Sequence, residues 1–148
     1  MKDNLFFIPG AVPSSKNSRM MTRSGFFIAS KATQKYMKTT AGYWAMHKAR
    51  FKKVAAQHEK PLILGFHFVR GSKHKWDFIN PAQTIQDEMT KAGWIDDDNV
   101  TEILPVPLMI DHEYWSYDKN KPGVYIAVLS SFNEGFINIP KNEITKTK

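Results

Sequence analysis

The stretch formed by residues 75–99 constrains the fold most, because it predicts one short helix with carboxylates beyond both of its ends. Residues 81–92 repeat apolar side chains at the spacing of an amphipathic helix. Asn80 suits the N-cap, and Pro81 suits the first helical position, where its missing N–H costs nothing. Gly93 favours the left-handed conformation that closes a helix. The apolar stripe consists of Ile85, Met89 and Ala92.

Aspartates flank this predicted helix, and they are candidate ligands for a divalent metal ion. Asp77 precedes the helix, whereas Asp96, Asp97 and Asp98 follow it. Hydrolysis of a phosphodiester needs an activated water and a counter-charge for the developing anion, and Mg²⁺ held by a few carboxylates supplies both. The run Asp-Asp-Asp-Asn is also a good turn sequence, so the residues alone favour an ordinary turn over a metal site.

The distance between the two acidic ends sets a geometric condition on any shared metal. Twelve helical residues span ~18 Å, and residues 93–97 can fold back by at most ~13–14 Å. Asp77 and Asp97 can therefore share an ion only if the helix is short and Asp97 lies on a returning segment, or if the site is assembled across a subunit interface. We favour the returning segment.

Outside this stretch, apolar runs and helical spacing predict one further long helix and several strands. Ser30 suits the N-cap of the long helix. Residues 62–69 are apolar on both faces, which indicates a central strand. Pro105 and Pro107 make their segment an edge strand or a bent one. The long helix is predicted at residues 31–57, and the strands at residues 5–8, 26–28, 62–69, 100–110 and 123–129.

The remaining segments predict loops and a single domain. Residues 111–121 are interpreted as a polar loop, residues 132–139 as a segment that packs back, and residues 141–148 as a frayed end. The order of elements predicts an α+β fold with a mixed, mostly antiparallel sheet and helices packed on one side. A chain of 148 residues fits one domain, spanning residues 1–148.

The composition limits where the protein is expected to work and which cofactors it is expected to use. The chain has no cysteine, so disulfides and thiolate metal sites are excluded. No apolar run approaches the ~20 residues of a membrane helix, and the first residues lack a secretory signal. These features predict a soluble, cytoplasmic protein. No phosphate-binding loop of the glycine-rich kind is present, and no small-molecule cofactor is expected.

Basic residues give the chain a formal charge of +7, which favours a polyanionic partner or, alternatively, a solvated basic surface. Basic clusters lie near the acidic stretch and in the loop after the first strand. They suit phosphate contacts, which position a protein without reading base sequence. The candidates for these contacts are Lys16, Asn17, Arg19, Lys73, His74 and Lys75.

The stretch around the helix resembles the RusA family of Holliday junction resolvases. The family pattern is an Asp, a second Asp two residues on, an Asn, a helix, Lys-Ala-Gly and an Asp-Asp pair. Residues 13–19 also resemble the family's Pro-x-Ser-x-Asn loop. Ile79 stands where the second Asp is expected, and Gln83 stands where many members have a lysine. The residues that match are Asp77, Asn80, Asp87, Lys91, Ala92, Gly93, Asp96 and Asp97.

The resemblance implies a homodimeric, Mg²⁺-dependent endonuclease that acts on four-way DNA junctions in recombination and repair. It favours the metal interpretation for Asp77 and Asp97, with Asp98 assisting. Lys75 is expected to stabilise the scissile phosphate. The predicted DNA-binding set is Lys16, Asn17, Arg19, Lys73, Lys75, Asn80 and Gln83.

Two rival hypotheses remain open at this point. The first is a DNA-binding relative that has lost cleavage, which Ile79 and Gln83 favour. The second is a basic scaffold protein without a nucleic-acid partner.

Overall fold

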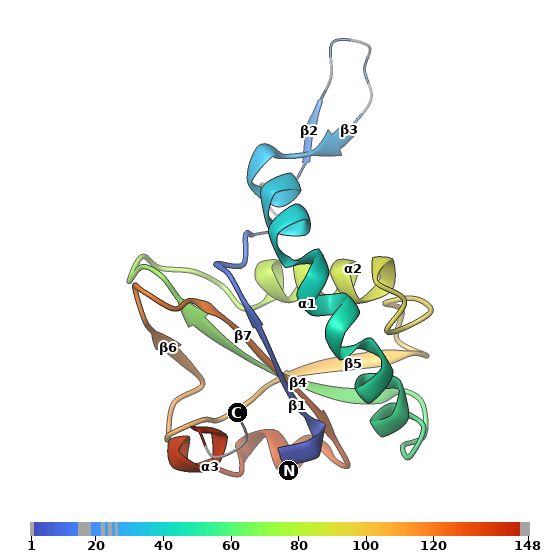
Figure 1. The fold of residues 1–148 in the computed structure, drawn as a ribbon, viewed down its shortest axis with the longest axis vertical. Coiled ribbons are helices and arrows are strands. Elements are labelled where there is room, and N and C mark those ends of the chain that lie inside the picture. The colour runs from blue at the N-terminus through green and yellow to red at the C-terminus, as the bar shows by residue number, and fades with distance from the viewer. Residues whose placement is uncertain (1, 15–18, 22, 24, 26, 146–148) are drawn as a thin grey trace.

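A five-stranded sheet forms the centre of the computed structural model, which describes residues 2–14, 19–21, 23, 25 and 27–145. The order is β1, β7, β4, β5, with β6 also pairing with β4 (Figure 1). β7 pairs antiparallel with both β1 and β4, whereas β5 and β6 run parallel to β4. The predicted α+β class with a mixed sheet is confirmed. The strands are β1 (Leu5–Pro9), β4 (Leu62–Arg70), β5 (Ile103–Pro107), β6 (Trp115–Tyr117) and β7 (Gly123–Leu129).

β4 is the central strand that its sequence predicts. Its neighbours are β7 on one side and β5 and β6 on the other. Leu64, Phe66 and Phe68 point to one face and are buried. β5 lies at the edge, as Pro105 and Pro107 require, since proline cannot donate to a strand on its outer side. The parallel pairing of β5 with β4 makes α2 and its return turn the crossover between two neighbouring strands.

Two helices cover one face of the sheet. In Figure 1, α1 (Lys31–Ala55) crosses the front of the sheet, with α2 (Ile79–Lys91) beside it. The α1 helix begins at the predicted cap, because the Ser30 hydroxyl accepts a hydrogen bond from the Thr33 N–H at 3.2 Å. It ends at Ala55, two residues before the predicted end. The buried residues of α1 include Tyr36, Thr40, Trp44 and Phe51, whose helical spacing places them on the face toward the core.

The start of α2 differs from the prediction. The helix begins at Ile79 and not at Pro81, and Asn80 is not its cap. The Asp77 carboxylate accepts the hydrogen bond from the Asn80 N–H at 3.1 Å, which is the part played by a capping side chain. The carboxylate of Asp77, three residues earlier, thus takes the capping part that the sequence had assigned to the Asn80 side chain. The end is as predicted, with Gly93 at φ +78°.

The other face of the sheet is covered by the C-terminal segment. A second core cluster there includes Leu108, Leu129, Ile139 and Ile144, so both faces are packed. The segment that follows β7 forms the turn η3 (Phe132–Phe136) and then α3 (Lys141–Thr145). The prediction of fraying from residue 141 is wrong for α3, because Ile144 is buried in this cluster. The predicted loop at residues 111–121 is also wrong in part, since it contains β6.

A separate two-stranded ribbon projects from the N-terminal part of the chain. β2 (Arg19–Met21) and β3 (Phe27–Ala29) pair antiparallel and lie beyond the start of α1 (Figure 1). β3 overlaps the strand predicted at residues 26–28. The short helix η1 (Lys2–Asn4) precedes β1. In the part of the chain that the structure describes, no helix has both the length and the apolar character needed to cross a bilayer.

Candidate acidic site around helix α2

Asp77 is fixed against the first turn of α2. Its carboxylate accepts hydrogen bonds from the Asn80 backbone N–H at 3.1 Å and from the Asn80 side-chain amide at 2.8 Å. A carboxylate at this end of a helix is also favoured by the helix dipole. Asp77 remains exposed to solvent, so it is held in position while its outer side stays accessible. Asn80, which we expected at DNA, orients this acid.

Trp94 anchors the turn that follows α2. It is 3% exposed and packs against Phe6, Trp44 and Phe51, with its ring stacked on Phe51 at 4.6 Å. Its indole N–H donates to the Trp44 carbonyl at 2.8 Å. Because Gly93 lets the chain reverse direction, the residues after Trp94 start from a fixed point in the core and run back beside α2.

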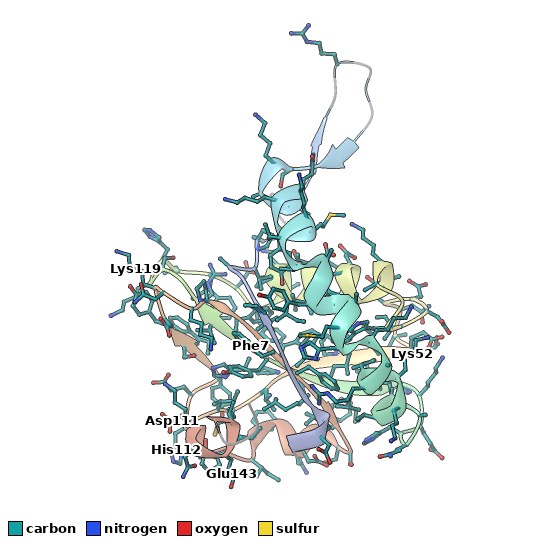
Figure 2. All side chains as sticks on the ribbon, in the orientation of Figure 1. Phe7, Lys52, Asp111, His112, Lys119 and Glu143 are labelled. Atoms are coloured by element: carbon teal, nitrogen blue, oxygen red, sulfur yellow. The ribbon has the colours of Figure 1, made fainter. Side chains whose placement is uncertain are left out.

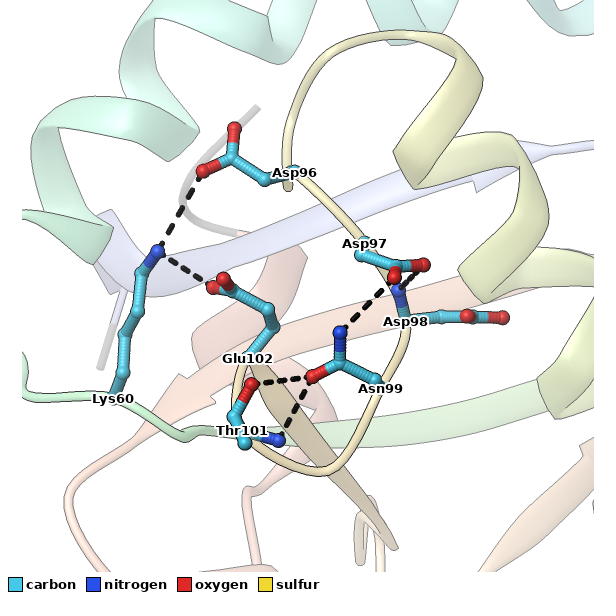
Figure 3. Close-up of polar contacts among 7 residues, drawn as sticks. All are labelled: Lys60, Asp96, Asp97, Asp98, Asn99, Thr101 and Glu102. Carbon is cyan, nitrogen blue, oxygen red and sulfur yellow. Dashed lines mark hydrogen bonds and ion pairs between the residues drawn. The ribbon is translucent and has the colours of Figure 1, made fainter.

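Asp96 and Asp97 make contacts away from α2 (Figure 3). Asp96 lies 3.6 Å from the Lys60 ammonium, which also pairs with Glu102. Asp97 accepts hydrogen bonds from the Asp98 N–H at 2.8 Å and from the Asn99 amide at 3.0 Å. These hydrogen bonds, with the Asp98 N–H first, lower the pKa of Asp97. Asp97 therefore stabilises its own turn, which is the ordinary interpretation of the Asp-Asp-Asp-Asn run.

Asp98 makes the contact that joins the turn to the helix. The Gln83 side-chain amide donates to Asp98 at 2.7 Å and to Asp87 at 2.9 Å. One amide thus holds together two carboxylates that come from different segments. The acidic turn therefore returns along α2, as the geometric condition on a shared metal requires. The returning acid that contacts the helix is Asp98 and not Asp97.

The ionised form of Asp87 is destabilised by its surroundings. Partial burial, as the main cause, raises the pKa of Asp87, and the neighbouring negative charge of Asp98 raises it further. The hydrogen bond from Gln83 and the charge of Lys91 oppose this rise. A divalent cation bound between the two carboxylates would relieve the repulsion, because an opposite charge favours the ionised form.

The residues fit Mg²⁺ held by a pair of carboxylates. Mg²⁺ commonly binds one or two protein carboxylates, keeps several waters and takes further oxygens from substrate phosphates. Asp87 and Asp98 meet that requirement. Among the described residues, however, no group of three or more Asp, Glu or His side chains is arranged to hold a metal ion. Asp77, Asp97 and Asp98 are thus not brought together as one three-carboxylate group.

Ile79 lies on the surface at the start of α2. It is 78% exposed and occupies the first helical position. Residues four apart share a helix face, so Ile79, Gln83 and Asp87 form one row along α2. The position that lacks the expected carboxylate is therefore in line with the acids that the structure does pair. Asp87 was not predicted as a metal ligand. Its position four residues after Gln83 is the sequence signal that places the two side chains on one helix face.

The basic candidates occupy two places. Lys73 and Lys75 lie in the exposed turn that leads from β4 to Asp77, and the Lys73 ammonium lies 4.9 Å from the centre of the Tyr117 ring. Arg19 is the first residue of β2. Lys16 and Asn17 lie outside the described residues.

No protein-family model matches the chain, and no curated protein matches it either.

Proposed function

We propose that this protein is a Mg²⁺-dependent, structure-specific endonuclease that acts on branched DNA, such as the four-way junctions of recombination and repair. The observation that carries the proposal is the double hydrogen bond of Gln83 to Asp87 and Asp98. It supports a site in which the acids after α2 return to the helix. The resemblance of this stretch to RusA resolvases supplies the substrate class.

In this proposal the metal is held by Asp98 and its neighbour Asp87, with Asp77 and Asp97 as the further acids of the site. Bound Mg²⁺ would supply an activated water and a counter-charge at the scissile phosphate. Asn80 holds the Asp77 carboxylate, and Gln83 keeps the Asp87 and Asp98 carboxylates together. Lys75, exposed two residues before Asp77, offers a cation to the substrate phosphate.

The DNA contacts proposed around this site are electrostatic. The net charge of +7 supports a polyanionic partner. Lys73 and Lys75 border Asp77, and the basic segment with Lys16, Asn17 and Arg19 is the second contact. Replacing Lys16 and Arg19 by Ala should reduce the slope of log affinity against log salt by ~0.9 for each lost phosphate contact.

A homodimer and a cytoplasmic location belong to the same proposal. Paired cuts in a two-fold symmetric junction need paired sites, which a two-fold dimer supplies. Sedimentation of the purified chain tests the dimer. The absence of cysteine fits a reducing compartment.

The deciding experiment is a nicking assay on a synthetic four-way junction with and without Mg²⁺. We expect Mg²⁺-dependent cuts, and a loss of about 100-fold or more in Asp77→Asn, Asp87→Asn and Asp98→Asn. Junction binding should be retained in each, because neutralising an acid does not remove a phosphate contact. Glu59→Gln, an exposed acid in the turn before β4, is the matched control and should cut normally.

The second candidate function is a DNA-binding relative that does not cleave. It is favoured by the exposed Ile79 side chain in line with the acids and by the lack of a three-carboxylate group among the described residues. Salt-dependent junction binding without nicking at any Mg²⁺ concentration would select it. Absence of binding to junction DNA would overturn both candidates and leave the scaffold hypothesis.

A further inference from the structure

A row of aromatic side chains reaches the open edge of the sheet beside β4. Trp76 and Trp115 meet edge to face with ring centres 5.6 Å apart, and Trp76 also contacts the buried Phe68. Trp115 is 37% exposed, and Tyr117, on the same short strand β6, is 42% exposed. Large aromatic rings are therefore anchored to the core at one end and open to solvent at the other.

Cations are held over these rings. The Arg70 guanidinium lies 5.1 Å from the centre of the Trp76 ring, and the Lys73 ammonium lies 4.9 Å from the centre of the Tyr117 ring. Such contacts hold a positive charge against an aromatic face. The result is a surface that alternates rings and positive charges.

Two chain segments build this surface side by side. Arg70 pairs with Tyr117 in the β4–β6 ladder, and the Asp118 N–H donates to the Arg70 carbonyl at 2.9 Å. Residues 70–76 contain three Lys or Arg and no acid, and residues 115–121 contain two Lys and one acid, Asp118. The Asp118 carboxylate is used within its turn, where it accepts the N–H groups of Asn120 and Lys121. The two segments together carry a formal charge of +4 with histidine neutral.

The surface is continuous with a hollow and with the acidic site. A cavity of about 740 Å³ is bordered by Lys73, Trp115, Tyr117 and Lys121, and its lining also includes the acids Asp111, Glu113 and Asp118. Figure 2 shows Lys119 at the outer tip of the turn between β6 and β7. Trp76 precedes Asp77 directly in the chain, so this aromatic surface adjoins one acid of the candidate site.

We propose that this edge binds single-stranded nucleic acid, with unpaired bases stacked on Trp115 and Tyr117 and phosphates held by Lys73, Lys119 and Lys121. Exposed aromatic rings beside cations are the combination by which proteins bind unpaired strands without reading sequence. Bases inside a duplex are already stacked on one another, so they cannot use these rings. The inference rests on the proposed function, which makes DNA the partner, and adds that the protein engages an unpaired strand beside the branch.

The test is binding of a fluorescent 15-nucleotide oligo-dT in EDTA, compared with an abasic oligonucleotide of the same length and with a duplex. We expect the wild type to bind oligo-dT at least about fivefold more tightly than the abasic strand, because stacking on an aromatic ring is worth ~1–3 kcal/mol per base. Tyr117→Leu and Trp115→Leu should remove this preference. Tyr117→Phe and Trp115→Phe, which keep a ring, should retain it. Tyr114→Leu, an exposed aromatic that contacts Phe136 instead, is the control.

Each result supports or overturns the inference. Equal affinity for oligo-dT and the abasic strand, or an unchanged preference in both Leu variants with native thermal melts, overturns stacking. Binding of the duplex as tight as that of oligo-dT reduces the surface to a general phosphate contact and also overturns it. Because the measurement excludes Mg²⁺ and needs no cleavage, it separates this inference from the proposed nuclease: a protein that prefers oligo-dT but never nicks a junction contradicts only the latter.

Discussion

Three aspartates follow one another in the chain at positions 96, 97 and 98. Asp98 lies in a different environment from Asp96 and Asp97. Asp96 pairs with Lys60 and Asp97 closes its own turn, so both are satisfied near the surface. Asp98 reaches across to Gln83 on α2 and lies beside Asp87. The difference shows that a run of like residues does not define a site: the direction of each side chain decides which carboxylate can act with another.

The comparison also separates two kinds of electrostatic environment. Hydrogen bonds lower the pKa of Asp97, whereas burial and the charge of Asp98 raise the pKa of Asp87. The first carboxylate is stabilised as an anion by the protein itself. The second is destabilised as an anion and gains most from an added cation. The predictions below test this contrast, beginning with the largest expected effect.

Trp94 supports the whole acidic turn, so its removal should abolish the contrast. Trp94→Ala leaves a cavity among Phe6, Trp44 and Phe51 and should cost ~3–5 kcal/mol of unfolding free energy, measured by urea denaturation. Trp115→Ala is the matched control, because Trp115 is 37% exposed and should cost much less. Similar losses in both variants would contradict the role of Trp94 as the anchor.

Metal binding should distinguish Asp98 from Asp96 without any measurement of activity. An ion that binds only the folded state raises the unfolding free energy by about 1.4 kcal/mol when its concentration is ten times Kd. We expect Mg²⁺ to raise Tm in the wild type and in Asp96→Asn, and to have little effect in Asp98→Asn. Thermal melts in EDTA and in increasing Mg²⁺ provide the measurement. A full Mg²⁺ response in Asp98→Asn would exclude Asp98 as a ligand.

The raised pKa of Asp87 should make the thermal stability of the protein depend on pH. Because its folded pKa is raised, ionisation costs stability as the pH rises above the ordinary aspartate value of 3.8. In EDTA, Asp87→Asn should therefore melt above the wild type at neutral pH, and the difference should shrink as the pH falls below 3.8, where Asp87 becomes protonated in both states. Asp97→Asn should show the opposite sign at neutral pH, since its pKa is lowered.

The sequence predicted most of the fold because regular apolar spacing specifies elements directly. Helices α1 and α2, the central strand β4 and the edge strand β5 follow from such patterns. β6 and α3 were missed, because β6 is short and exposed and α3 depends on Ile144 reaching a distant cluster. At the candidate site, the motif named the acids but did not indicate that Asp98, and not Asp97, contacts α2. Which acid contacts α2 depends on where Trp94 and Gly93 aim the returning chain, which no local spacing encodes.

The smallest expected effect on stability is that of replacing Ile79, and the same substitution tests whether position 79 takes part in the activity. Its side chain is 78% exposed at the first residue of α2, so burial does not oppose a charge there. A carboxylate near a helix N-terminus gains ~0.3–1 kcal/mol from the helix dipole. Ile79→Asp should therefore melt at or slightly above the wild-type temperature even in EDTA, although Asp77 nearby reduces the gain by repulsion. Ile79 is in the same row as Gln83 and Asp87, two helical turns before Asp87, so the new carboxylate extends the row of acids from Asp87 toward Asp77. We expect a larger Mg²⁺-induced rise in Tm and faster junction nicking than in the wild type.

The control is Ile79→Asn, whose side chain has the shape of aspartate without its charge, and it should show neither effect. Equal Mg²⁺ responses in Ile79→Asp and Ile79→Asn would remove position 79 from the site.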